Sequence, residues 1–193
     1  MTRQDVVNAL VAVRGDAPVI SGPGTVSRLL FVTQHKAATI YQMDLAYATS
    51  MSLGVALARP DQHRVVGIEG DGSIIAALGV FTTIGRYQPK NHVSIIVDDG
   101  VYGSVVDGTL ETGTSGGTDL AAVAKGCGIK NALTVKDRDE AAQVLRRAFA
   151  EPGPWVVVMK VNNSDRMLMR DRRGIIHFDI VETALNYRRE LAQ

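Results

Sequence analysis

Short, continuous apolar runs separated by helix-forming segments are the feature that most constrains the fold of this chain. Three runs are rich in β-branched residues and bounded by polar or turn residues: Arg64–Ile68, His92–Val97 and Pro154–Val161. A strand that is apolar on both of its faces is typical of a parallel sheet with helices on both sides. The sequence therefore predicts an α/β fold built on a doubly wound parallel sheet.

The remaining elements follow the same alternation. Shorter strands are predicted at Ala17–Ile20, Thr39–Met43 and Ala132–Val135. Helical spacing of apolar residues, or an abundance of helix formers, predicts helices at 3–13, Arg28–Thr33, Leu45–Ala58, 74–86, Asp119–Gly126, Arg138–Ala150 and Ile180–Leu191. Segment 107–118 is rich in small polar residues without apolar periodicity, so we expect a loop that moves. We expect one domain over 1–193, with 165–193 as a C-terminal tail that ends in a helix.

Composition places the chain among ordinary globular proteins and excludes several classes of partner. Of its 193 residues, 46% are hydrophobic and 21% are charged, enough for one sizeable core. A formal net charge of +1 gives no reason to expect nucleic acid or a membrane as partner. The single cysteine, Cys127, allows no internal disulfide, and the N-terminal segment is an amphipathic helix rather than a signal peptide. We therefore expect a cytoplasmic protein.

Two of the predicted strands end in acidic residues and glycines. The run Val65–Ser73 leads from a strand into Gly70–Gly72, and the next strand ends at Asp98–Gly100. Glycines allow the backbone to approach a ligand closely, and a helix N-terminus offers free N–H groups to a phosphate. Asp71 lies between the glycines, where a carboxylate can hold a hard cation such as Mg²⁺ together with phosphate oxygens.

The spacing of these two strand ends determines whether they indicate a ligand site or two ordinary turns. A lone Gly-Asp-Gly is a common turn, and Asp-Asp-Gly after a strand is an ordinary loop start. The chain between Gly72 and Asp98 has room for one helix and one strand, so a right-handed crossover would place the two strand ends side by side. No Gly-x-Gly-x-x-Gly follows a strand, and the P-loop pattern is absent. A magnesium–diphosphate site is therefore the best interpretation.

Other candidate groups lack the context that their chemistry needs. Cys127 has no suggested histidine partner and is interpreted as a core residue. The arginines of Met167–Gly174 are interpreted as a solvated surface. The histidines have no metal-ligand spacing: His35, His63, His92 and His177.

Residues 70–104 resemble the thiamine-diphosphate motif, which opens with Gly-Asp-Gly and closes with Asp-Asn or paired asparagines. Among thiamine-diphosphate-dependent enzymes, the chain most resembles the small subunit or C-terminal domain of sulfopyruvate and phosphonopyruvate decarboxylases. Their Asp-Asn-Gly-Val-Tyr-Gly-Ser run is nearly reproduced at Asp98–Ser104. Gly22–Leu30 is similar to the family's glycine-containing loop, and Met43–Asp61 to its Ser-Met-Gly-His-Ala helix start. The resemblance covers about residues 1–161.

The resemblance implies thiamine diphosphate and Mg²⁺ as cofactors. It implies Mg²⁺ ligands at Asp71, Asp99 and the backbone carbonyl of Val101. It also implies that Leu45 bends the cofactor into a V shape and that the Met43 carbonyl accepts from its 4′-amino group. Ser73 and the N–H groups near Ser104 would hold the diphosphate, with Thr25 as a further hydroxyl donor. The other residues of the implied cofactor-binding set are Gly70, Gly72 and Tyr102.

The chain departs from the family pattern at three places. Asp99 stands where Asn is usual, Leu45–Tyr47 replaces Met-Gly-His, and Pro23 replaces a hydroxyl residue. The family's activating glutamate belongs to a pyrimidine-binding domain, and Glu69 is not in the right place to substitute for it. The resemblance therefore implies a partner subunit that carries this domain, and no certain catalytic residue in this chain.

The expected function is that of the diphosphate-binding subunit of a two-subunit thiamine-diphosphate-dependent decarboxylase, a lyase acting on a small 2-oxo acid. One alternative is a carboligase subunit of the acetolactate or acyloin synthase kind. The other alternative is a non-catalytic, cofactor-binding or regulatory subunit, which the changes at Ala46, Tyr47 and Asp99 motivate.

Overall fold

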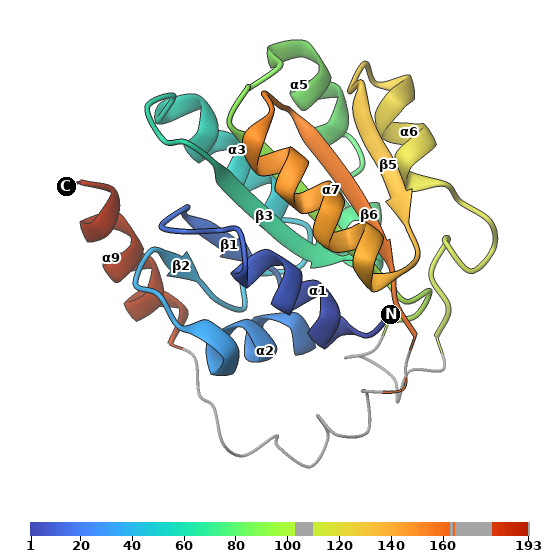
Figure 1. Cartoon of the computed structure of the whole chain (residues 1–193), viewed down its shortest axis with the longest axis horizontal. Coiled ribbons are helices and arrows are strands. Elements are labelled where there is room, and N and C mark those ends of the chain that lie inside the picture. Colours follow the sequence, from blue (N-terminus) through green and yellow to red (C-terminus); the bar gives the residue numbers. More distant parts are fainter. Residues whose placement is uncertain (103–109, 163, 165–178, 193) are drawn as a thin grey trace.

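A single six-stranded parallel sheet organises the computed structural model, which describes residues 1–102, 110–162, 164 and 179–192 (Figure 1). The strand order is β2-β1-β3-β4-β6-β5, and each neighbouring pair is parallel. The strands are β1 Val19–Ser21, β2 Thr39–Ile40, β3 Val65–Gly70, β4 His92–Asp98, β5 Asn131–Val135 and β6 Trp155–Lys160. The predicted doubly wound α/β fold is confirmed.

Helices cover both faces of the sheet (Figure 1). Helices α1, α2 and α7 bury their apolar side chains in one core, and α3, α4, α5 and α6 in another on the opposite face. Helix α9 packs beside the edge strand β2. The helices are α1 Arg3–Val11, α2 Thr25–Gln34, α3 Ala48–Ala58, α4 Asp71–Ile75, α5 Val80–Tyr87, α6 Leu120–Gly126, α7 Arg138–Ala150 and α9 Ile180–Leu191.

The central strands are buried on both faces, which explains their continuous apolar sequences. In β4, Ile95 packs into the core beneath α1 and α7, whereas the next residue, Ile96, packs into the core of the opposite face. In β6, Val157 and Val158 divide between the two cores in the same way. Successive side chains of a strand point to opposite faces, so a strand between two helix layers needs apolar residues at every position.

Four predicted elements differ from the observed ones. The helix expected at Arg28–Thr33 begins three residues earlier, at Thr25, and forms α2. The helix expected at 74–86 is divided into α4 and α5 by a turn at 76–79, in which the Val80 N–H donates to the Ala77 carbonyl. The helix expected from Leu45 begins only at Ala48, because Ala46 has a φ of 78° that an α-helix cannot contain. The strand expected at Thr39–Met43 ends at Ile40, and Gln42 has a φ of 55°.

The strand order fixes where a ligand can bind. The chain passes from β1 to β2 on one side and returns to β3 on the other side of β1. In open parallel sheets the crevice at such a switch point, beyond the carboxyl ends of the strands, is the usual ligand site. The residues that follow β1, β3 and β4 are therefore the candidates. None of the helices described here is long and apolar enough to cross a membrane.

Candidate cofactor site

The acidic ends of β3 and β4 lie side by side. The two strands are parallel neighbours in which Gly70 pairs with Val97, so Asp71 and Asp98 follow at adjacent positions. Both aspartates are buried, with 1% and 2% of their surface exposed. The prediction that a crossover brings these strand ends together is confirmed.

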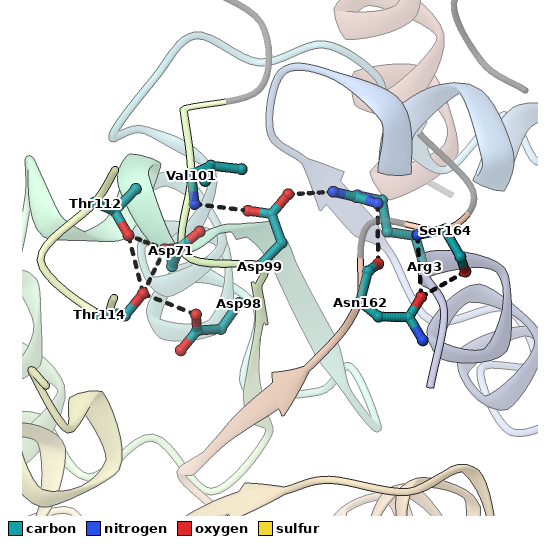
Figure 2. A network of polar contacts seen from close by, with 9 residues as sticks. All are labelled: Arg3, Asp71, Asp98, Asp99, Val101, Thr112, Thr114, Asn162 and Ser164. Carbon is teal, nitrogen blue, oxygen red and sulfur yellow. Dashed lines mark hydrogen bonds and ion pairs between the residues drawn. The ribbon is translucent and has the colours of Figure 1, made fainter. Parts of the chain in front are cut away.

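Two threonines that follow β4 in the sequence, Thr112 and Thr114, cover the buried aspartates (Figure 2). The hydroxyl groups of Thr112 and Thr114 both donate to Oδ2 of Asp71. Thr114 Oγ1 is also 2.8 Å from Oδ1 of Asp98. The threonines are held by an antiparallel bridge between Val101 and Glu111. Within the segment expected to be a mobile loop, Thr112 and Thr114 are thus packed on the site, and 107–109 lie outside the described residues.

This threonine–aspartate cluster has more acceptor oxygens than hydrogens to share. Two hydroxyl hydrogens serve four oxygen–oxygen contacts: Thr112–Asp71, Thr114–Asp71, Thr114–Asp98 and Thr112–Thr114. Burial raises the pKa of the Asp71 carboxyl, and the nearby Asp99 charge acts in the same direction, against the hydrogen bonds from the threonines. An excess of buried acceptors is the environment that a hard cation satisfies, so the donor set fits Mg²⁺.

Asp98 and its neighbour Asp99 are each paired with a cation. Lys160 lies at the end of β6, and its Nζ is 2.5 Å from Oδ2 of Asp98. The guanidinium of Arg3 pairs with Oδ2 of Asp99, and the Val101 N–H lies 3.3 Å from Oδ1 of the same carboxylate. Among the described residues, no cluster of three or more His, Cys, Asp or Glu side chains forms a ready metal site. A cation here would therefore need backbone or phosphate oxygens beside the aspartates.

The loop after β1 forms the other wall of the crevice. Gly22 packs directly on Glu69, since a Cβ at position 22 would lie 2.8 Å from the Glu69 Cβ. The Gln42 side chain accepts from the Gly24 N–H at 2.9 Å and donates to the Gly24 carbonyl at 2.8 Å. These bonds hold the loop that precedes Thr25, the first residue of α2, and contact between Thr25 and a diphosphate stays a prediction.

The segment between β2 and α3 presents the residues expected at the thiamine rings. The Met43 N–H donates to the Ser21 carbonyl at 2.9 Å, which ties this segment to the end of β1. Leu45 is 40% exposed, and its contact with the cofactor stays a prediction. Ala46 holds its left-handed backbone while its N–H donates to Ser73 Oγ at 2.9 Å.

A buried glutamate, Glu69, stabilises the backbone turn at Ala46 through Ser73. The Ser73 hydroxyl donates to one oxygen of Glu69, and the other oxygen accepts from the Thr49 N–H at 2.9 Å. Thr49 is in the first turn of α3, where a carboxylate is favourable. The Ser73 hydroxyl therefore bridges Ala46 and Glu69, and diphosphate contact by Ser73 stays a prediction.

The remaining predicted residues are placed as follows. A Cβ on Gly72 would lie 2.4 Å from the ring of Tyr102, so the missing side chain makes room for this tyrosine. Gly70 has ordinary space around it, with its nearest neighbour at 3.9 Å. Ser104 lies outside the described residues. Gly72 and Tyr102 are thus in mutual contact at the end of β3.

Sequence reasoning missed several residues of this site. Thr112 and Thr114 fall in the segment interpreted as a loop, because no local pattern distinguishes them from linker residues, and only the structure shows that both are buried. Arg3 and Gln42 carried no motif, because each reaches the site from an element distant in sequence. Glu69 had a detectable signal, since a carboxylate inside an apolar strand needs a specific partner.

Comparison with known proteins agrees with this geometry. Residues 31–159 match the family of thiamine pyrophosphate enzymes, C-terminal TPP binding domain. The chain belongs to this family of thiamine-diphosphate-binding domains.

The particular relatives are decarboxylases. The chain is 33% identical to sulfopyruvate decarboxylase subunit beta of Methanocaldococcus jannaschii, over 82% of each chain. It is 34% identical to phosphonopyruvate decarboxylase of Streptomyces viridochromogenes, over 76% of this chain and 36% of the relative. The crystal structure of benzoylformate decarboxylase from Polynucleobacter necessarius shares the fold, with a TM-score of 0.67 and 20% identity. That match covers 83% of this chain and 33% of the larger one.

Replacing Thr114 tests whether the threonine cluster stabilises the buried carboxylates. Thr114→Val keeps the shape of the side chain but removes the hydroxyl between Asp71 and Asp98. We expect the free energy of unfolding to fall by about 1–3 kcal/mol, because a buried acceptor is left without its donor. Thr118→Val, at an exposed position of the same segment, should change it by less than about 0.5 kcal/mol. Equal unfolding midpoints for the two variants in urea would contradict this assignment.

Proposed function

We propose that this chain is the diphosphate-binding subunit of a thiamine-diphosphate-dependent 2-oxo acid decarboxylase. The observation that carries the proposal is the cluster of buried aspartates at the ends of β3 and β4, which is short of positive charge. Membership of the thiamine-diphosphate-binding family and the names of the relatives support it. The carboligase alternative is not favoured by those names.

Magnesium would be held by Asp71, Asp99 and the backbone carbonyl of Val101, together with diphosphate oxygens. Both threonine bonds to Asp71 end at Oδ2, which leaves Oδ1 for a cation. When bound, thiamine diphosphate supplies a nucleophilic carbon and an electron sink for decarboxylation. The chain's own residues anchor and orient it, with Leu45 and Met43 toward its rings and Thr25, Gly70 and Gly72 toward its diphosphate.

The site needs a second polypeptide to be complete. Glu69 is buried between Ser73 and Thr49, so it is not available to activate a pyrimidine ring, and Asp44, which lies between Met43 and Leu45, is exposed. We propose a hetero-oligomer in which a pyrimidine-binding subunit supplies the activating glutamate. The designation of relatives as subunit beta is consistent with such an assembly.

The proposed substrate is a small 2-oxo acid, and the relatives' names direct attention to those with a sulfonate or phosphonate group. We further propose that residues 1–193 form one diphosphate-binding domain with 165–193 as its C-terminal tail. Because Cys127 is a free thiol, we place the protein in the cytoplasm.

A substrate panel tests the assignment. The chain, co-purified with its complementary subunit, is supplied with thiamine diphosphate and Mg²⁺, and CO₂ release and acyloin formation are measured for each 2-oxo acid. We expect CO₂ and the aldehyde as the main products from at least one acid with an anionic tail. Cofactor binding without any turnover would instead favour a regulatory subunit, and acyloin as the main product would favour a carboligase.

A further inference from the structure

Arg3 reaches the candidate magnesium site from the first turn of α1. A capping box formed by Thr2 and Asp5 fixes the start of this helix. From there the Arg3 guanidinium pairs with Oδ2 of Asp99, and its Nη1 lies 3.4 Å from the Asn162 carbonyl. The side chain is only 7% exposed and Asp99 only 10%, so the ion pair is largely shielded from water. Arg3 thus joins α1 to the ends of β4 and β6.

The charges around the site show what this pair can contribute. Three aspartates meet at the ends of β3 and β4, and a diphosphate would bring further negative charge. Lys160 offsets Asp98 but its side chain is 39% exposed, so solvent screens its charge more than that of Arg3. Asp71 has no cationic partner among the residues described here. Without Arg3, Asp71 and Asp99 would both face an anionic ligand uncompensated.

The geometry of Asp99 also depends on Arg3. The guanidinium holds Oδ2, while Oδ1 accepts the long, 3.3 Å contact from the Val101 N–H. Figure 2 shows Asp99 between Arg3 on one side and Val101 and Asp71 on the other. Oδ1 of Asp99 is therefore the oxygen that faces the candidate cation site, and the bond between Arg3 and Oδ2 sets its position.

We propose that Arg3 is a positioning residue of the magnesium–diphosphate site. It compensates the charge of Asp99 and orients that carboxylate so that Oδ1 is available to the cation. This inference rests on the proposed function, because it assigns Asp99 to a cation bound with diphosphate. It predicts that Arg3 matters only as long as residue 99 carries a charge.

A double-mutant cycle tests this dependence. Arg3→Gln, Asp99→Asn and the double variant are made in the full chain and co-purified with the complementary subunit. Affinity for thiamine diphosphate is measured by calorimetry across a range of Mg²⁺ concentrations. Arg3→Gln should weaken Mg²⁺-dependent affinity by about 10- to 100-fold, the usual effect of removing the partner of a metal ligand. In the Asp99→Asn background, Arg3→Gln should lower the Mg²⁺-dependent affinity for thiamine diphosphate by less than about threefold, because residue 99 no longer carries the charge that Arg3 compensates.

Two controls separate this role from stability and from direct binding. Arg59→Gln breaks an exposed ion pair with Asp61 and should leave affinity unchanged. Unfolding by urea without cofactor verifies that each variant is folded at the titration temperature. Equal losses in both backgrounds would indicate direct contact with diphosphate and overturn the inference, as would no loss in either. Absence of Mg²⁺-dependent binding in the unaltered protein would instead overturn the proposed function, and this inference with it.

Discussion

Replacing Asp71 by alanine should nearly abolish Mg²⁺-dependent binding of thiamine diphosphate. Asp71 is buried at the start of α4, and it is the carboxylate of the cluster whose excess of acceptors a cation would relieve. We expect affinity to fall by more than about 100-fold, because loss of a ligand should exceed the 10- to 100-fold typical of its supporting partners. Calorimetric titration of the assembled protein measures the effect.

Matched variants make the Asp71 result specific. Asp61→Ala removes an exposed carboxylate paired with Arg59 and should leave the affinity unchanged. Asp71→Asn keeps an oxygen that can accept from the threonine hydroxyls, so this variant should retain the fold while binding the cation more weakly. Undiminished affinity in Asp71→Ala, or in the unaltered protein with EDTA, would rule out the site.

The isolated chain should be catalytically silent. Its Glu69 is buried between Ser73 and Thr49 and is not available to hydrogen-bond the pyrimidine ring, and Asp44, between Met43 and Leu45, is exposed. The activating glutamate that the family resemblance implies belongs to the pyrimidine-binding domain. Groups of this kind contribute about 10²–10⁴-fold to rate, and weaker cofactor binding would add to the deficit. CO₂ release from 2-oxo acids, measured for the chain alone and with the complementary subunit, should differ by at least this factor. Full turnover by the isolated chain would exclude the two-subunit interpretation.

The elements that the sequence predicted best are those whose local signals agree with their tertiary surroundings. Helices α7 and α9 match their predicted bounds because an aspartate caps each of them, Asp137 and Asp179. The buried strands β3, β4 and β6 were predictable because both of their faces pack against helices, which demands apolar residues throughout. The adjacency of the ends of β3 and β4 then followed from the handedness of crossovers.

The parts that could not be predicted depend on long-range contacts. The left-handed backbone at Ala46 is stabilised by Ser73 and Glu69, which lie at the end of β3, so no local sequence pattern predicts it. Thr112 and Thr114 resemble linker residues until the bridge to Val101 places them over Asp71. The same holds for Arg3, whose partner lies 96 positions away.

Electron paramagnetic resonance with Mn²⁺ in place of Mg²⁺ tests the central claim most directly. The claim is that this chain holds the metal ion and the diphosphate of thiamine diphosphate together at the ends of β3 and β4. In the assembled protein with cofactor, the Mn²⁺ signal should show hyperfine coupling to ³¹P, and the coupling should disappear in Asp71→Ala at the same concentrations. A Mn²⁺ signal without ³¹P coupling, or coupling that is unchanged in Asp71→Ala, would contradict the account.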